Sequence, residues 1–158
     1  MKYSPNIQKQ PTNITYPWSF NMKEENKFDW HNYYLLAESL ESDDFAKLRT
    51  GINRFYYSGF LESRDYLIKN RIFLDKKSKE TMTSKSSHVH EETRKIFRNH
   101  NLLNTSRKGE LIASELHELR KYRNMVDYDA KRPEKIKFAY TYCKARAKIV
   151  LDLLDELN

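Results

Sequence analysis

The scarcity of glycine and proline is the feature that most restricts how this chain folds. Its 158 residues include 3 glycines and 4 prolines, and three of those prolines fall within the first 17 residues. Sandwiches and barrels of β-strands need many turns, and turns depend on these two residue types. The composition therefore argues against an all-β fold and favours an all-α one. At this length, one domain with a single hydrophobic core is the simplest expectation.

Apolar residues that recur every three or four positions locate the helices. The clearest pattern runs from about residue 45 to 70, directly after the capping sequence Ser42-Asp43-Asp44. An earlier helix is expected at about 28–41, with Trp30, Tyr34 and either Leu35 or Leu36 facing inward. Three more helices are predicted at 88–99, at about 109–127, and from Pro133 onward, where the proline suits a first helical position.

Two segments lack this period. Residues 1–22 form an irregular N-terminal arm in our prediction, and residues 71–86, which are polar and rich in Ser, Thr and Lys, form an exposed loop. Gly51 and Gly59 lie inside the longest predicted helix on nearly one face. Glycine inside a helix costs stability, so this pair predicts a close approach by another helix, from the same chain or a second copy. The expected architecture is a single-domain antiparallel bundle of about five helices over 23–158.

Composition also limits location and partners. Cys143 is the only cysteine, which fits a reducing compartment, and it falls on an apolar stripe as a buried thiol would. No apolar run is long enough to span a membrane and no signal-peptide core precedes the domain, so we expect a cytoplasmic protein. The net charge of +7 and pI near 9.3 favour polyanionic partners such as RNA. We expect no cofactor and no metal, since the sequence lacks a Walker loop and any zinc-ligand spacing.

Arg123 stands where the pattern of the fourth predicted helix calls for an apolar residue. The rest of its stripe consists of Ile112, Leu116, Leu119 and Val126. A guanidinium on a buried face must be paired or hydrogen-bonded. Asp127 and Tyr128 follow about one turn later, so Arg123, Asn124, Asp127 and Tyr128 are the principal candidate catalytic residues. The competing interpretation is structural, with Arg123 closing an internal ion pair or extending its head to solvent.

Two histidines are candidates to assist Arg123. His117, Asn124 and Tyr128 follow the spacing i, i+7, i+11 on a polar stripe, which makes His117 a further candidate catalytic residue. His88 precedes or opens the third predicted helix and is a candidate RNA-binding residue. For each of them the competing interpretation is an ordinary surface or capping histidine.

The second helix and the basic residues near Arg123 supply the remaining RNA- or nucleotide-binding candidates. Positions 56 and 57 are both tyrosine, and adjacent helical residues point about 100° apart, so both can hardly be central to the core. We expect Tyr57 to reach the polar stripe, where it would hydrogen-bond Asp127 or stack on a base. Arg54 is the expected partner of Asp127 or Asp129. Arg120 is a further cation that would keep these carboxylates from repelling phosphate.

Three segments together carry a family resemblance. Residues 48–60 read LRTGINRFYYSGF, Ser87-His88 is followed by Phe97, and residues 119–129 read LRKYRNMVDYD. In this order they resemble the long helix, the Ser-His segment and the Arg-Asn closing motif of one bacterial branch of the HEPN domain family. The resemblance spans about residues 45 to 130. HEPN domains are small helical bundles that often occur beside minimal nucleotidyltransferases.

The resemblance implies RNA chemistry, in a toxin–antitoxin or defence setting. Many HEPN domains are metal-independent ribonucleases in which an Arg-x4-6-His motif from each of two protomers meets across a homodimer interface. Attack by a neighbouring 2′-hydroxyl needs a proton acceptor, a proton donor and cations around the phosphate. Arg123 suits the phosphate role, but the histidine position holds Tyr128. A phenol of pKa near 10 is a poor base at neutral pH, although it still donates a hydrogen bond.

Two functions therefore remain open at this point. The first is an RNA- or nucleotide-directed HEPN-like module, with or without ribonuclease activity. The second is a non-catalytic helical adaptor that binds a nucleotidyltransferase-like protein, in which the same residues form a structural polar network. Both are compatible with a homodimer.

Overall fold

A computed structural model describes residues 28–128 and 135–158, and within these ranges the chain forms helices and no strand. The helices are α1 (His31–Ser39), α2 (Phe45–Lys69), α3 (Lys76–Thr83), α4 (Val89–Asn99), α5 (Asn101–Asn104), α6 (Lys108–Tyr128) and α7 (Ile136–Asp155). The predicted all-α class is confirmed, with seven described helices in place of about five. The predicted arm at 1–22 and the helix start at Pro133 lie outside the described residues.

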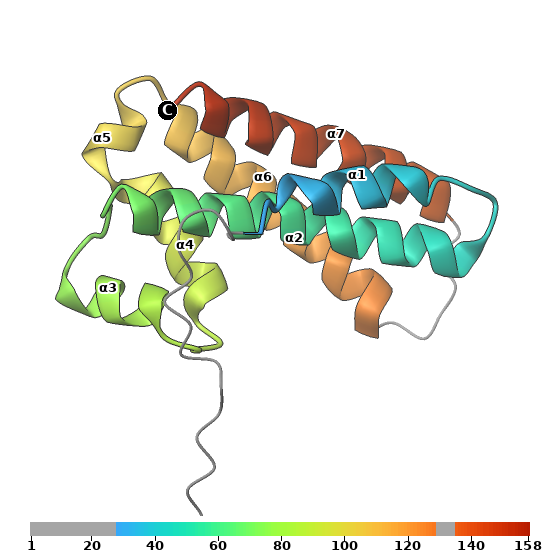
Figure 1. The fold of residues 1–158 in the computed structure, drawn as a ribbon, viewed down its shortest axis with the longest axis horizontal. Helices are drawn as coiled ribbons and strands as arrows, with labels where there is room; N and C mark the ends of the chain where they lie inside the picture. The colour runs from blue at the N-terminus through green and yellow to red at the C-terminus, as the bar shows by residue number, and fades with distance from the viewer. Residues whose placement is uncertain (1–27, 129–134) are drawn as a thin grey trace, which may run out of the picture.

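Helices α1, α2, α6 and α7 alternate in direction along one axis (Figure 1). Helix α2 lies at the centre of this arrangement and contacts the other three. The shorter α3, α4 and α5 connect α2 to α6 at one end of the molecule, and α4 packs against α6. None of the described helices is long and apolar enough to cross a membrane.

Helix α2 forms where its sequence predicts. The Asp44 carboxylate accepts hydrogen bonds from the backbone N–H groups of Ala46 and Lys47 at 2.8 and 3.0 Å, which satisfies donors that the first turn leaves open. Its apolar stripe is buried against the neighbouring helices, and this stripe includes Leu48, Ile52, Phe55 and Leu67. The thiol of Cys143 on α7 is also buried, as expected, and burial raises its pKa to about 12.

The two glycines of α2 mark close approaches within the chain. A Cβ atom on Gly51 would lie 2.5 Å from Cε2 of Tyr140 on α7, which is closer than side-chain atoms tolerate. A Cβ atom on Gly59 would lie 3.4 Å from Cγ1 of Val150, an ordinary contact. The predicted close approach is thus made by α7 in the same chain, and Gly51 is the position that requires it.

Two sequence-based expectations are wrong. Residues 71–86 are not a loop throughout, because they contain α3. Asp75 caps this helix by accepting a hydrogen bond from the Ser78 N–H at 2.7 Å, and Met82, within the helix, is fully buried. A single buried apolar side chain leaves no period for a sequence pattern to show. In α1, the inward positions are Tyr34 and Ala37, whereas both leucines at 35 and 36 are exposed.

Candidate nucleic-acid interface

Arg123 lies on α6 where this helix faces α2, and 17% of its side chain is exposed. Each of its guanidinium nitrogens has a partner. Nε lies 2.9 Å from Oδ2 of Asp127, Nη1 donates to Oδ1 of Asn124 at 3.0 Å, and Nη2 donates to the Tyr57 hydroxyl at 2.8 Å. The expected burial and pairing of Arg123 are therefore confirmed. We call these four side chains, together with Asn53, the Arg123 network.

Asp127 connects this network to α2 a second time. Its Oδ2 accepts a hydrogen bond from Nδ2 of Asn53 at 2.8 Å. The expected partner, Arg54, instead places its guanidinium 5.0 Å from the ring centre of Tyr33. The prediction was wrong by one residue, since Asn53 rather than Arg54 binds Asp127. Adjacent residues of a helix point about 100° apart, and only one of these two side chains faces α6. Asp129, the other expected partner of Arg54, is outside the described residues.

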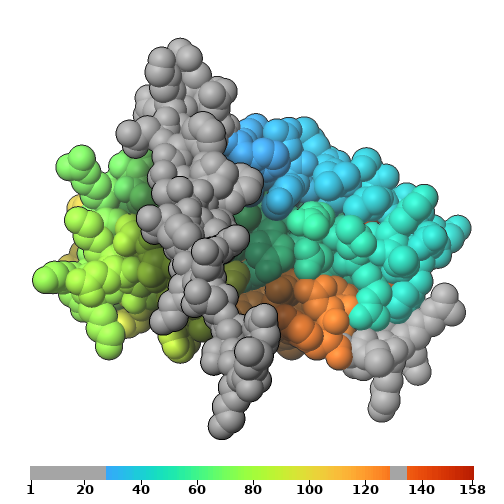
Figure 2. Space-filling view, turned by 60° about the horizontal axis from the view of Figure 1, so that its bottom comes forward, coloured from blue at the N-terminus to red at the C-terminus, as the bar shows by residue number. Residues whose placement is uncertain are grey.

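Aromatic rings surround the Arg123 guanidinium. Its central carbon lies 5.4 Å from the ring centre of Tyr57, 5.5 Å from that of Tyr128 and 5.9 Å from that of Tyr56. These distances suit cation–π attraction. Tyr57 is partly buried, whereas the Tyr128 ring at the end of α6 is 75% exposed. Figure 2 shows this end of α6, in orange, beside the N-terminal half of α2 on one face of the molecule.

A partly buried histidine that sequence reasoning missed lies next to the network. Nδ1 of His90 on α4 is 2.6 Å from the Tyr56 hydroxyl, and the His90 ring also lies in tilted contact with the ring of Phe60, 4.1 Å between ring centres. Burial and, after it, the charges of Arg120, Arg123, Arg64 and Arg94 together lower the pKa of His90 to about 4. Burial also raises the pKa of Tyr56, so at neutral pH the phenol donates to a neutral imidazole. The spacing of residues in the sequence does not predict the Tyr56–His90 pair, because the pair depends on how α4 packs against α2.

Beside the Arg123 network, a shallow cavity of about 350 Å³ opens between α4 and α6. We call it the basic hollow. Its lining side chains are Arg94, His117, Arg120, Lys121 and Asn124, with no carboxylate among them. Nη1 of Arg94 lies 2.7 Å from Nδ1 of His117. Asn124 belongs to both regions, since its amide oxygen binds Arg123 while its side chain borders the hollow. The sequence offered no signal for Arg94, which comes from a different helix.

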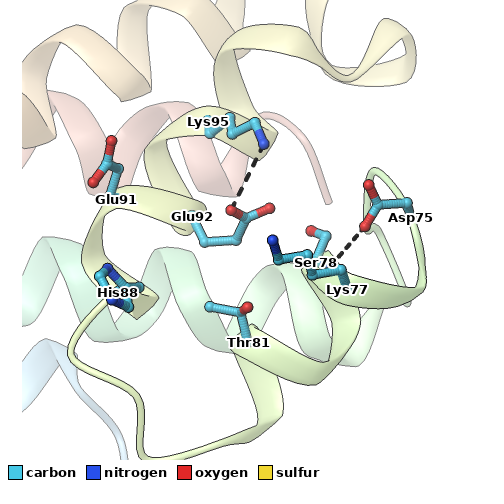
Figure 3. Close-up of a pocket in the computed structure, with 8 residues that line it drawn as sticks. All are labelled: Asp75, Lys77, Ser78, Thr81, His88, Glu91, Glu92 and Lys95. Carbon is cyan, nitrogen blue, oxygen red and sulfur yellow. Dashed lines mark hydrogen bonds and ion pairs between the residues drawn. The ribbon is translucent and has the colours of Figure 1, made fainter.

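His88 lies at a different place from these groups. It is at the N-terminal end of α4, on the rim of a hollow between α3 and α4 (Figure 3). That hollow carries mixed charge, including Asp75, Glu92 and Lys95, and Nζ of Lys95 is 4.0 Å from Oε2 of Glu92. The structure thus brings Arg123, Asn124, Asp127, Tyr57 and Tyr128 together, places His117 and Arg120 in the adjoining basic hollow, and leaves His88 apart.

Across residues 28–128 and 135–158, no group of three or more His, Cys, Asp or Glu side chains is arranged to hold a metal ion. Comparison of the chain with protein-family models, with curated proteins and with solved structures found no match. Its function must therefore be argued from the residues themselves.

Proposed function

We propose that this chain is an RNA-directed, HEPN-like module that holds RNA phosphate in its basic hollow. The supporting observation is the lining of that hollow, which contains Arg94, Arg120 and Lys121 and no carboxylate. Nζ of Lys121 also lies 3.9 Å from Oε2 of Glu118, which is outside the lining. Guanidinium groups bind two phosphate oxygens at once, and cations of this kind supply most of the affinity of proteins for nucleic acid. The net charge of +7 also favours binding of a polyanion such as RNA.

Two side chains next to Arg123, those of Asn124 and Tyr128, support the hollow. Asn124 uses its amide oxygen for Arg123, so its NH₂ group is left to donate toward the hollow. The exposed Tyr128 ring lies beside a cation, an arrangement on which an unpaired base stacks well. Arg123 reaches phosphate directly only through the N–H groups that its present partners leave unused.

The proposal includes a cytoplasmic location and a role in a toxin–antitoxin or defence system, with a homodimer as the working assembly. Cleavage of RNA in such a site uses the neighbouring 2′-hydroxyl and no metal. Any cleavage should therefore persist in EDTA and leave a 2′,3′-cyclic phosphate. Tyr128→Phe should reduce it if the phenol donates a proton, and leave it unchanged if the ring only stacks.

A second candidate function is a non-catalytic adaptor that binds a nucleotidyltransferase-like protein. The three contacts of the Arg123 guanidinium favour it, because a phosphate-binding arginine usually keeps more of its donors free. In this function Arg123 only fastens α6 to α2, and the basic surface contacts acidic groups on the partner.

Binding of a fluorescein-labelled, mixed-sequence oligoribonucleotide, followed by fluorescence anisotropy over a series of salt concentrations, tests the proposal. Arg120→Ala should weaken binding and reduce the salt-dependence slope by about one, since each lost phosphate contact releases one counterion fewer. Lys79→Ala is the matched control, because it removes one positive charge from an exposed position on α3. Equal weakening by both variants, or no binding at low salt and tens of micromolar protein, would overturn the proposal.

A further inference from the structure

The contact between Arg94 and His117 fixes where the histidine carries its proton. The two side chains come from α4 and α6, and Nη1 of Arg94 lies 2.7 Å from Nδ1 of His117. A guanidinium has only donors, so Nδ1 must be the acceptor and carries no hydrogen. The ring is then neutral, with its single proton on Nε2.

This arrangement leaves the basic hollow lined by hydrogen-bond donors. His117 offers Nε2–H, Arg120 and Lys121 offer cationic donors, and Asn124 offers the amide NH₂ that Arg123 does not use. A carboxylate or a free imidazole nitrogen would have been an acceptor, and neither lines the hollow. The chemical group that complements several converging donors and at least two cations is an anion with acceptor oxygens only, as a phosphate is.

The same geometry limits proton transfer by His117 in this state. Its Nδ1 lone pair is occupied by Arg94, so this nitrogen does not act as a base while that contact holds. A neutral histidine still acts as an electrophilic hydrogen-bond donor, which is a recognised role beside developing negative charge.

We infer that His117 is a phosphate ligand that donates through Nε2–H, and that Arg94 is the positioning residue that holds it in this form. The inference rests on the proposed function only for the source of the phosphate. That source is either the RNA backbone or the terminal phosphate of a free nucleotide, and both present the same oxygens to the hollow.

The tautomer is tested directly by long-range ¹H–¹⁵N correlation spectra of the histidine side chains. We expect His117 to carry its proton on Nε2, and we expect Arg94→Met to abolish that preference. Titration with inorganic phosphate should shift the His117 signals and leave those of exposed His31 in place. A proton on Nδ1, or shifts at His31 equal to those at His117, would overturn the inference.

Affinity measurements separate this inference from the proposed function. His117→Leu should weaken binding of inorganic phosphate, AMP and the oligoribonucleotide by about tenfold, the loss of one hydrogen bond to a charged group. His117→Gln keeps an N–H donor and should recover part of the loss, while His31→Leu serves as the matched control. If RNA binding survives His117→Leu but not Arg120→Ala, the inference fails and the proposed function stands. If phosphate and AMP bind through His117 but RNA does not bind, the inference stands and RNA is the wrong source.

Discussion

The Arg123 network and the basic hollow lie side by side on α6, and they differ in what surrounds their arginines. Arg123 has a carboxylate, an amide oxygen and a phenol as partners, and only 17% of its side chain is exposed. Arg94 and Arg120 border an open hollow whose lining contains no acidic side chain. An arginine paired with a carboxylate stabilises the fold, whereas cations that line a hollow without a carboxylate attract an anion from outside. Net charge alone does not tell these two roles apart.

The Arg123 network also joins helix α6 to helix α2. Tyr57 and Asn53, both on α2, bind Arg123 and Asp127 on α6. Removal of Arg123 therefore leaves a carboxylate and a phenol without their principal partner. Removal of Arg120 leaves no comparable group unpaired in the hollow, so the two arginines should respond differently to the same substitution.

The largest expected effect is on stability at Arg123. Arg123→Met should lower the free energy of unfolding by about 2 to 4 kcal/mol, because it breaks a partly buried ion pair and leaves the Asp127 carboxylate without its cation, although the hydrogen bond from Asn53 remains. Arg120→Met, the matched control, should change it by less than about 1 kcal/mol. Urea denaturation of both variants provides the comparison. Equal losses would mean that the Arg123 network has no special structural role.

His90 should make the free energy of unfolding depend on pH. Its pKa is lowered by arginines of both the Arg123 network and the basic hollow. Its pKa is about 4 in the folded protein and near 6.5 when unfolded, so the unfolded state binds the proton more readily. The stability that the neutral His90 ring contributes is fully present above about pH 6.5 and is lost as the pH falls toward 4, with about 3 kcal/mol at stake. Urea midpoints measured from pH 7.5 to 4.5 should fall less steeply in His90→Gln. A slope unchanged from the wild type, with His31→Gln as control, would remove His90 from this explanation.

A smaller effect is expected at Tyr57. Tyr57→Phe removes the hydroxyl that Arg123 binds and keeps the ring, so it should cost about 1.5 kcal/mol, as hydrogen bonds to charged groups do. Combined with Arg123→Met, the two losses should be less than additive because they remove the same contact. Additive losses in this double-mutant cycle would show that the hydroxyl acts elsewhere.

Part of this molecule follows from its sequence and part does not. Helix α2 is predictable because its apolar period is long and Asp44 caps it. Arg123 was identifiable as a buried, paired cation because it interrupts an apolar stripe. Helix α3 escaped prediction because its burial rests on few side chains, of which Met82 is the apolar one.

The contacts between helices were harder to predict from the sequence. Asn53, rather than Arg54, binds Asp127, and a rotation of one residue on α2 decides between them. The pairs Tyr56–His90 and Arg94–His117 each join residues more than 20 positions apart. Helical period identifies the face on which a side chain lies, but only packing determines what that face meets.

Thermal unfolding with and without saturating oligoribonucleotide tests the division between the two regions most directly, because one experiment reports on both. The midpoint without RNA should fall by about 5 to 10 °C in Arg123→Met, and RNA should still raise it. In Arg120→Met the midpoint without RNA should stay within about 2 °C of the wild type, and the rise on adding RNA should largely disappear. The opposite pattern, in which Arg123→Met keeps its midpoint and loses the response to RNA, would contradict the assignment of stability to Arg123 and of phosphate binding to the basic hollow.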